Sequence, residues 1–294
     1  MRSHSGFALS ALLVTSLLPA QAPPWDAINQ ARGWSRIDVT GACAFHDPAS
    51  QTLQLWSQDA SLSGAISVQR LPSPPERFFF DARNQAWIAA GTTLYYLDRN
   101  GKVLDTTRLP AEVADLAWDG RFFYVTYKAA QLFVEKRDMK SGASVWSYGN
   151  KPNEDTRTPV AFHRIALSDD GTKVLVASGS TLDLTALDVA SGKTATPIKL
   201  APTPPLPTML HLGDQGRLPL HTWPGRPSVV FAATTADLNQ SGDAVLHLVK
   251  ADLEAGKLIQ QNTGLKTDHT FIGILDSQAV FTKPTGGMVM IPLL

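Results

Sequence analysis

The chain has 294 residues, of which 44% are hydrophobic and 18% are charged. This composition excludes an intrinsically disordered chain, which needs low hydrophobicity and high net charge, and the length fits one large domain or two small ones. The 26 basic and 26 acidic side chains cancel, so the chain lacks the positive charge with which proteins bind nucleic acids or anionic membranes.

The N-terminus has the features of a secretory signal peptide. Arg2 is followed by an apolar run from Phe7 to Leu18 and by Ala20-Gln21-Ala22, a small-residue cleavage site. As a helix the apolar run spans about 18 Å, which is too short for a hydrocarbon core of about 30 Å. We predict that a bacterium exports the protein to the periplasm or beyond, that residues 1–22 are removed, and that residues 23–294 form a single domain without a membrane span. A buried N-terminal strand or helix is the alternative.

Cys43 is the only cysteine. One cysteine cannot close an internal disulfide, so the stability of an exported chain must come from its core. The apolar neighbours Ala42, Ala44 and Phe45 favour a small buried side chain over a reactive nucleophile.

Short apolar strands separated by turn residues recur along the chain. In the clearest copies an aspartate bonds backbone amides of the turn and a glycine takes a positive φ. These aspartates are Asp59 in a degenerate copy, then Asp98, Asp138, Asp188 and Asp252, which gives a period of about forty residues with insertions. A second hairpin precedes each one, most clearly at Ser168-Asp169-Asp170-Gly171 and more weakly elsewhere, as at Leu212-Gly213-Asp214-Gln215-Gly216.

Four strands in each unit predict the blades of a β-propeller, an all-β fold. We expect a single propeller of six four-stranded antiparallel blades, at about residues 34–72, 73–110, 111–150, 159–201, 206–262 and 267–294. Prolines at 72, 110 and 202 follow the last strand of three blades and stop the sheet there. The sixth unit ends before a fourth strand, so we expect an N-terminal strand to close the ring. Residues 34–40, which would leave the first blade one strand short, and residues 25–33, which read more like a helix, are the alternatives.

The segment from Ser168 to Ala177, followed by Leu187-Asp188-Val189-Ala190-Ser191-Gly192-Lys193, resembles the bacterial YVTN and WD40-like propeller repeats. The resemblance covers most of the chain and implies the propeller architecture. These families include lactonases, surface-binding proteins and assembly scaffolds, and no catalytic residue carries over to this sequence. The Trp118-Asp119 dipeptide lies in the first hairpin of its unit and not at the end of the third strand, so it does not mark a eukaryotic WD40 blade.

Polar residues at the starts of the innermost strands are the best candidates for a site. Glu112, His163 and His269 each stand seven residues before a turn aspartate, and Asp115, Arg164, His211, Glu76, Arg77 and Asp268 lie nearby. On one rim of the channel, such a set can coordinate a metal or bind an acidic or sugar-like ligand. Solvated loop residues are the alternative interpretation, and the sequence favours it.

Two further features lie in loops. Asp237, Asn239 and Ser241 are spaced like the first ligands of a calcium loop with Gly242 at its sixth position, but Val245 and Leu248 stand where later ligands are needed. We therefore favour a plain turn and expect no cofactor. The long connection from Ala201 to Pro227 carries Trp223, which either stacks on a ligand or, as we favour, packs under its own loop.

The sequence supports two main functional hypotheses, and a role as one subunit of a redox or envelope assembly is a third. The favoured one is an exported, non-enzymatic propeller that binds a protein, peptide or glycan through one rim, without nucleic acid as a partner. The alternative is a hydrolase or lyase of the lactonase kind, with His163, His269, Glu112 and Asp115 as metal ligands or general base. The identity of the ligand and the oligomeric state are left open by the sequence.

Overall fold

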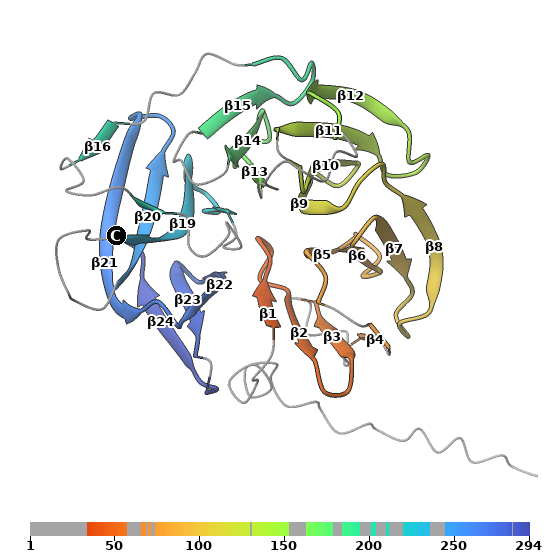
Figure 1. Cartoon of the computed structure of the whole chain (residues 1–294), viewed down its shortest axis with the longest axis horizontal. Coiled ribbons are helices and arrows are strands. Elements are labelled where there is room, and N and C mark those ends of the chain that lie inside the picture. The colour runs from red at the N-terminus through yellow and green to blue at the C-terminus, as the bar shows by residue number, and fades with distance from the viewer. Residues whose placement is uncertain are drawn as a thin grey trace, which may run out of the picture.

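The fold is a ring of six small β-sheets around a common axis (Figure 1). The computed structural model describes residues 34–57, 66–68, 70–71, 74–129, 131–152, 163–178, 184–194, 201–203, 210–211, 220–235, 245–283 and 285–294. The segment predicted to be the signal peptide lies outside these residues. All regular elements in the described part are strands, and none of its segments is a helix long and apolar enough to cross a membrane.

The first three sheets have four strands each, in chain order from the axis outwards. They contain β1 (Trp34–Ile37), β2 (Cys43–Asp47), β3 (Thr52–Trp56) and β4 (Ile66–Val68), then β5 (Arg77–Phe80), β6 (Ala86–Ala90), β7 (Thr93–Leu97) and β8 (Val103–Arg108), then β9 (Val113–Trp118), β10 (Phe122–Tyr127), β11 (Phe133–Asp138) and β12 (Ser144–Gly149).

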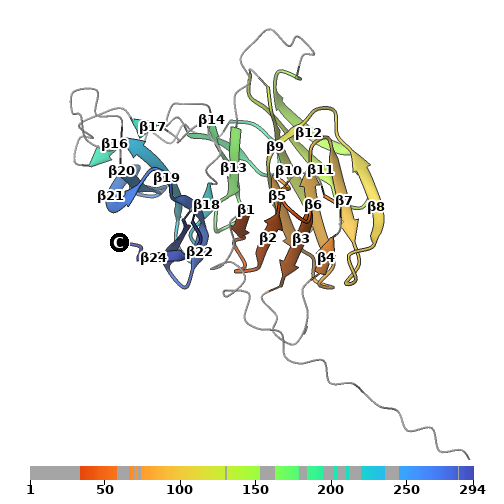
Figure 2. The same cartoon turned by 60° about the horizontal axis from the view of Figure 1, so that its bottom comes forward.

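The other three sheets depart from this number. The fourth has β13 (His163–Leu167), β14 (Lys173–Ser178) and β15 (Leu184–Asp188). The fifth contains β16 (Ala201–Thr203), β17 (Leu210–His211), β18 (His221–Thr222), β19 (Ser228–Thr235), β20 (Val245–Asp252) and β21 (Lys257–Lys266). The sixth has β22 (Thr270–Leu275), β23 (Gln278–Thr282) and β24 (Met288–Pro292). The side view in Figure 2 shows these sheets standing around the axis, so the predicted six-bladed propeller is confirmed.

Apolar side chains pack between neighbouring blades. The core forms six clusters, and each draws its buried residues from two adjacent sheets. The last cluster joins Ile37 and Cys43 of the first blade to Ile272 and Val280 of the sixth. This cluster closes the ring, because burying apolar surface between the first and last blades stabilises their contact. It also confirms the expected burial of Cys43, whose thiol has its pKa raised to about 12 by burial and by the nearby Asp38.

The turns form as the sequence predicted. Asp138 accepts hydrogen bonds from the amides of Lys140 and Ser141, at 3.1 and 2.8 Å, while Gly142 has a φ of 68°. The turn at Asp188 repeats this arrangement with Ser191 and Gly192. The carboxylate satisfies amides that the hairpin leaves unpaired, and glycine adopts the positive φ without a steric penalty.

The structure decides one of the two alternatives for ring closure. Residues 34–40 do not supply the closing strand, because β1 pairs with β2 as the innermost strand of the first blade. That blade is therefore not one strand short. Residues 25–33 lie outside the described part of the chain. Over the described residues, the contact between β1 and β22 and the cluster around Ile37 hold the first and last blades together.

The fifth blade differs most from the prediction. Ala201 and Pro202, expected at the end of the fourth blade, instead pair in parallel with Lys257 and Leu258 on the outer edge of the fifth sheet. The first hairpin of this blade is the turn between β18 and β19. There the amide of Trp223 donates a hydrogen bond of 3.0 Å to the carbonyl oxygen of Ser228, and Gly225 has a φ of 71°. The segment 212–216, predicted as this hairpin, lies outside the described residues. The true turn was missed because it uses Pro-Gly where the repeat uses aspartate.

Tryptophans contribute to the packing between blades, as the sequence predicted. Trp87 is buried between the second and third blades, and Trp118 packs against the same cluster. Trp56 packs at the junction of the sixth and first blades, and Trp146 at that of the third and fourth. The Trp146 indole donates a hydrogen bond of 3.1 Å to the carbonyl oxygen of Val189 in the next blade, so these rings help to fix how the blades stack.

Candidate functional site

Five innermost strands each place one charged or ionisable side chain at the axis. All five side chains belong to residues that are at most 9% exposed. We call this group the hub; it consists of Arg36 of β1, Arg77 of β5, Asp115 of β9, Arg164 of β13 and His221 of β18. The sixth blade contributes Gly273 of β22, and a Cβ there would lie only 3.2 Å from Cε1 of His221.

Asp115 links its blade to both neighbours. Its carboxylate accepts two hydrogen bonds from Arg77, at 2.7 Å from Nε and 3.2 Å from Nη2, and a third of 3.1 Å from the amide of Ile165 in the fourth blade. Nη2 of Arg77 also donates to the carbonyl oxygen of Leu220 in the fifth blade, at 3.2 Å. Buried ions persist only when they are paired and hydrogen-bonded, and for Arg77 and Asp115 this condition is met.

Arg164 is held by the neighbouring blade. Its Nη1 donates a hydrogen bond of 2.7 Å to the carbonyl oxygen of Ala114. Arg164 is buried, and this hydrogen bond ties the fourth blade to the third.

Arg36 is the exception in the hub. Its Nε is buried and has no hydrogen-bond partner among the described residues, and its guanidinium carbon lies 5.6 Å from the centre of the Trp34 ring. Burial, together with the positive charges of Arg77 and Arg164, lowers the pKa of Arg36 to about 9. The guanidinium therefore remains charged at neutral pH, while its buried Nε has no hydrogen-bond acceptor among the described residues.

His221 completes the hub. Its ring packs edge-on against Phe271 at 5.2 Å, and its Nε2 is buried and without a hydrogen-bond partner among the described residues. Burial, with the charges of Arg77 and Arg36, lowers the pKa of His221 well below its usual value. The imidazole is therefore neutral at pH 7, and its buried Nε2 is left unsatisfied.

Two buried acids lie near the arginines of the hub. Asp115 is the ion-pair partner of Arg77, and the carboxylate of Asp38 is a second buried acid that interacts with Arg77. Burial raises the pKa of Asp38, against hydrogen bonds from its own turn at Thr40 and Ala42. Among the described residues, neither carboxylate satisfies Nε of Arg36.

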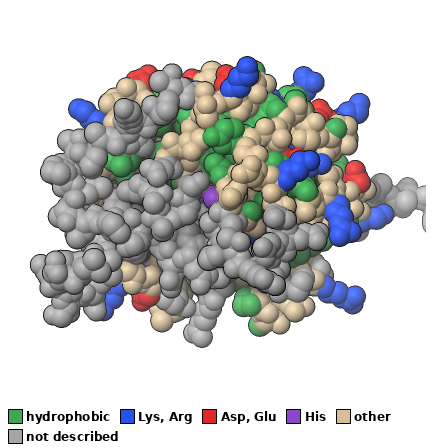
Figure 3. All heavy atoms as spheres, turned by 45° about the horizontal axis from the view of Figure 1, so that its top comes forward, with side chains coloured by type: hydrophobic (Ala, Val, Ile, Leu, Met, Phe, Trp, Pro, Cys, Tyr) green, Lys and Arg blue, Asp and Glu red, His purple; other side chains and the backbone are tan. Residues whose placement is uncertain are grey.

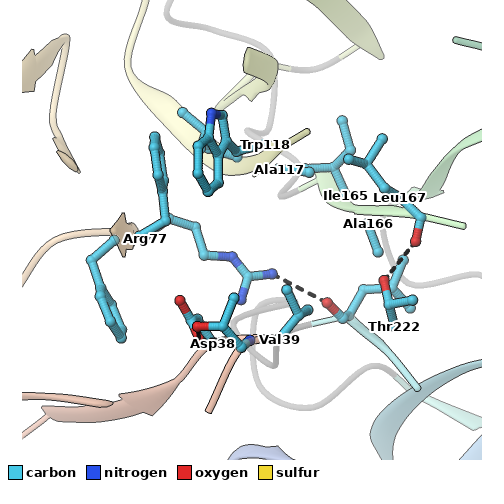
Figure 4. A pocket seen from close by; sticks show the side chains of 14 residues that line it. Asp38, Val39, Arg77, Ala117, Trp118, Ile165, Ala166, Leu167 and Thr222 are labelled. Carbon is cyan, nitrogen blue, oxygen red and sulfur yellow. Dashed lines mark hydrogen bonds between the residues drawn. The ribbon is translucent and has the colours of Figure 1, made fainter. Parts of the chain in front are cut away.

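A pocket opens beside the hub at the rim where the innermost strands end in their first hairpins, which we call the turn rim. Its volume is about 80 Å³, enough for a side chain or a small ligand group. Its lining comes from five blades: Asp38, Val39, Thr40, Arg77, Phe78, Phe79, Leu116, Ala117, Trp118, Ile165, Ala166, Leu167, Leu220 and Thr222. Figure 4 shows the Arg77 side chain extending between Trp118 and Asp38. The pocket is thus mostly apolar with one guanidinium in its wall.

The opposite rim, where the innermost strands begin, holds four of the residues predicted as a site: Glu76, Glu112, Asp268 and His269. Lys128 bridges Glu112 and Glu76, with both Nζ to oxygen distances at 2.7 Å. His269 pairs through Nδ1 with Asp268 at 2.7 Å. The structure thus brings Glu112 and Glu76 together through Lys128. The ion pair of His269 is with the adjacent residue, Asp268.

His163, Asp115 and Arg164 are buried in bonds between blades. Nε2 of His163 lies 3.3 Å from the carbonyl oxygen of Ala129, and burial lowers the pKa of its imidazole. The backbone of His211 pairs with Thr234 in β17, but its side chain is outside the described residues. No three His, Cys, Asp or Glu side chains in the described part form a metal-binding group. Ligand binding by the predicted set stays a prediction.

The two loop features have different outcomes. Trp223 packs in the cluster between the fifth and sixth blades, with Nζ of Lys250 5.4 Å from the centre of its ring. This agrees with the favoured interpretation of a side chain packed under its loop. Asp237, Asn239 and Ser241 lie outside the described residues, and the calcium loop stays untested.

Arg36 and His221 were missed by the sequence analysis, although a signal for them exists. Counting seven residues back from each turn aspartate finds the start of the innermost strand. The hub residues stand two to four residues before the turn, as Asp115 does before Asp119 and Arg77 before Asp81. Applying that spacing to the turns at Asp38 and Trp223 would have found both side chains.

The buried histidines predict a decline in stability at acidic pH. Because the folded state lowers the pKa of His221, protonation favours the unfolded state, in which the pKa is about 6.5. The free energy of unfolding should be flat above about pH 7.5 and should fall below pH 6.5, by up to about 1.4 kcal/mol per pH unit for each such histidine. Urea denaturation of the wild type and of His221→Gln tests this. A variant with an unchanged slope between pH 6.5 and 5 would contradict the assignment.

Together, the six blades, the axial hub and the rim pocket define a β-propeller with a candidate binding site on its axis. A chain of a crystal structure of the mitotic checkpoint complex is similar in fold, with a TM-score of 0.50, 8% identity, and coverage of 89% of this chain and 86% of that one. The Myceliophteria thermophila Cps50 (Swd1) β-propeller domain gives a TM-score of 0.47, 14% identity, and coverage of 88% and 96%. No protein-family model and no curated protein matches the chain.

Proposed function

We propose that the protein is a binding module that takes a peptide segment of a partner protein into the pocket at the turn rim. The single observation that carries this proposal is the pocket itself, an apolar cavity on the axis to which five blades contribute. Val39 at this pocket leaves 52% of its surface exposed. Apolar cavities with a few convergent polar groups are the usual form of a ligand site, and rigid blades hold this one in shape.

The aromatic residues favour a peptide over a glycan. Sugars bind to open aromatic faces, but the Phe79 ring stacks on Trp118 at 4.6 Å and on Trp87 at 6.2 Å. The faces of Phe79 are thus occupied by other rings. Figure 3 shows one face of the molecule, on which hydrophobic side chains lie among the described atoms and Lys and Arg lie mostly toward the periphery. The wall of the pocket itself is mostly apolar, so an apolar peptide side chain suits it.

A displayed library of random peptides tests the proposal. Peptides selected on the wild-type protein should bind Val39→Asp at least tenfold more weakly, because a carboxylate at the pocket mouth would be desolvated by an apolar side chain. Val103→Asp is the matched control: Val103 is 45% exposed on β8, at the outer edge of the second blade. Selection of no peptide, or equal losses in both variants, would overturn the proposal.

The proposal includes export and kinship with the bacterial YVTN and WD40-like propellers. It is supported by the signal-like residues 1–22 and by the Asp and Gly turns that recur in the blades. The intact mass of protein recovered from the periplasm should correspond to a chain that begins at Pro23. Recovery of the uncleaved chain in the cytosol alone would contradict export.

A further inference from the structure

We propose that the hub is a binding site for the carboxylate group of an organic acid, with Arg36 as its main partner. The proposal rests on two buried, unsatisfied groups in the hub, Nε of Arg36 and Nε2 of His221. It deepens the proposed function and rests on it, because the ligand would reach the hub through the pocket at the turn rim. The acid is either a free small molecule or a carboxylate carried by the bound peptide.

Arg36 calls for an anion. Its guanidinium is buried, Asp115 is engaged by Arg77, and Glu76 and Glu112 share Lys128 on the opposite rim. Asp115 and Glu76 act on the charge of Arg36, but neither satisfies its buried Nε. A buried ion without a partner costs several kcal/mol, so a negative charge beside Arg36 would be stabilised.

The unsatisfied atoms favour a carboxylate. Nε of Arg36 and Nε2 of His221 are both buried without hydrogen-bond partners among the described residues. A guanidinium presents donors in a planar fork that matches the two oxygens of a carboxylate. Nε2 of the neutral His221 can donate when the proton resides on that nitrogen. One carboxylate can therefore satisfy donors from the first and fifth blades together.

The pocket favours an organic acid over a bare inorganic anion. Arg77 belongs to both the hub and the pocket wall. The rest of the wall includes apolar side chains such as Leu116, Trp118 and Ile165. A ligand with a carboxylate at one end and an apolar or aromatic body at the other would place each part in matching surroundings, since apolar surface gains free energy by leaving water.

Benzoate and benzamide are the probes, because they share one shape and differ in charge. Isothermal titration at constant ionic strength should show benzoate binding at least tenfold more tightly than benzamide to the wild-type protein. Equal affinities would overturn the proposal. If sodium chloride displaces benzoate with equal affinity, the site belongs to a small inorganic anion and the proposal also fails. This comparison needs no variant, so it does not depend on whether a mutant folds.

Variants locate the site. Arg36→Gln should weaken benzoate binding at least tenfold, whereas Arg108→Gln, on the exposed outer strand β8, should leave it unchanged. Benzoate binding that survives Arg36→Gln in a folded protein would overturn the assignment to the hub.

The selected peptides distinguish the proposed carboxylate site from the proposed peptide-binding function. If amidation of the carboxylates leaves peptide binding intact and benzoate does not bind, the binding function stands and the carboxylate site fails. If benzoate binds but no peptide is selected, the carboxylate site stands and the peptide function fails. Competition between benzoate and a selected peptide with a free carboxylate would support both proposals and would identify the peptide as a source of the acid.

Discussion

Replacing Asp115 with alanine should lower the free energy of unfolding by about 3–5 kcal/mol, the range observed when one partner of a buried ion pair is removed. The carboxylate accepts two bonds from Arg77 and one from the amide of Ile165. Without it, three buried guanidiniums would face one another with less negative charge between them, and a buried amide would lose its acceptor. Urea denaturation followed by tryptophan fluorescence measures the change.

The control for this prediction is Asp105→Ala, because Asp105 is an exposed carboxylate on β8. Its loss should change stability by no more than about 0.5 kcal/mol. The double variant Arg77→Met with Asp115→Leu should recover part of the stability, since apolar residues of similar volume can replace a buried pair. A loss below 1 kcal/mol for Asp115→Ala would show that the hub does not depend on this ion pair.

Replacing Gly273 with alanine should destabilise the protein by about 2–4 kcal/mol, through overpacking and backbone strain. Gly273 has a φ of 152°, and a Cβ there would lie 2.7 Å from both Cβ and the carbonyl oxygen of Ile37. Strands β1 and β22 are thus too close together for any side chain at position 273. The register of β22 also shifts between Phe271 and Gly273, as in a bulge that brings backbone close to a neighbour.

Gly264→Ala provides the matched control for Gly273. Gly264 also has a positive φ, of 68°, but a Cβ there would meet nothing within 4 Å. Its substitution should therefore cost only the backbone strain, about 1 kcal/mol. Thermal unfolding of both variants measures the difference. Equal losses would show that the first and sixth blades are not as tightly joined as the structure has them.

The architecture could be predicted from the sequence because each repeat carries a recognisable turn motif. Asp138 and Asp188 bond amides within their own turns, so their identity can be inferred without knowledge of any distant contact. The alternating apolar strands also fix which faces lie between blades. Blade number and most boundaries followed from these two features, since each unit of about forty residues must bury its faces against its neighbours.

The site could not be predicted in the same way, because it depends on how the innermost strands of different blades are aligned around the axis. Arg36 and Asp115 are 79 positions apart in the sequence, and they come near enough for their charges to interact only because the ring brings both strands to the axis. The fifth blade shows the problem most clearly, since Trp223-Pro224-Gly225 replaces the usual aspartate turn and concealed the strand that carries His221. An error of ten residues in the position of that strand directed attention to His211 instead of His221, and to the opposite rim.

The central claim is that a ligand carboxylate reaches the arginines of the hub through the pocket on the turn rim. A crystal structure grown with 4-bromobenzoate tests this claim most directly, because bromine can be located by its anomalous scattering. We predict bromine beside Trp118 and Leu116, with the carboxylate within hydrogen-bond distance of Arg36 or Arg77. Bromine on the outer strands, or a carboxylate that points away from the hub into solvent, would contradict the claim.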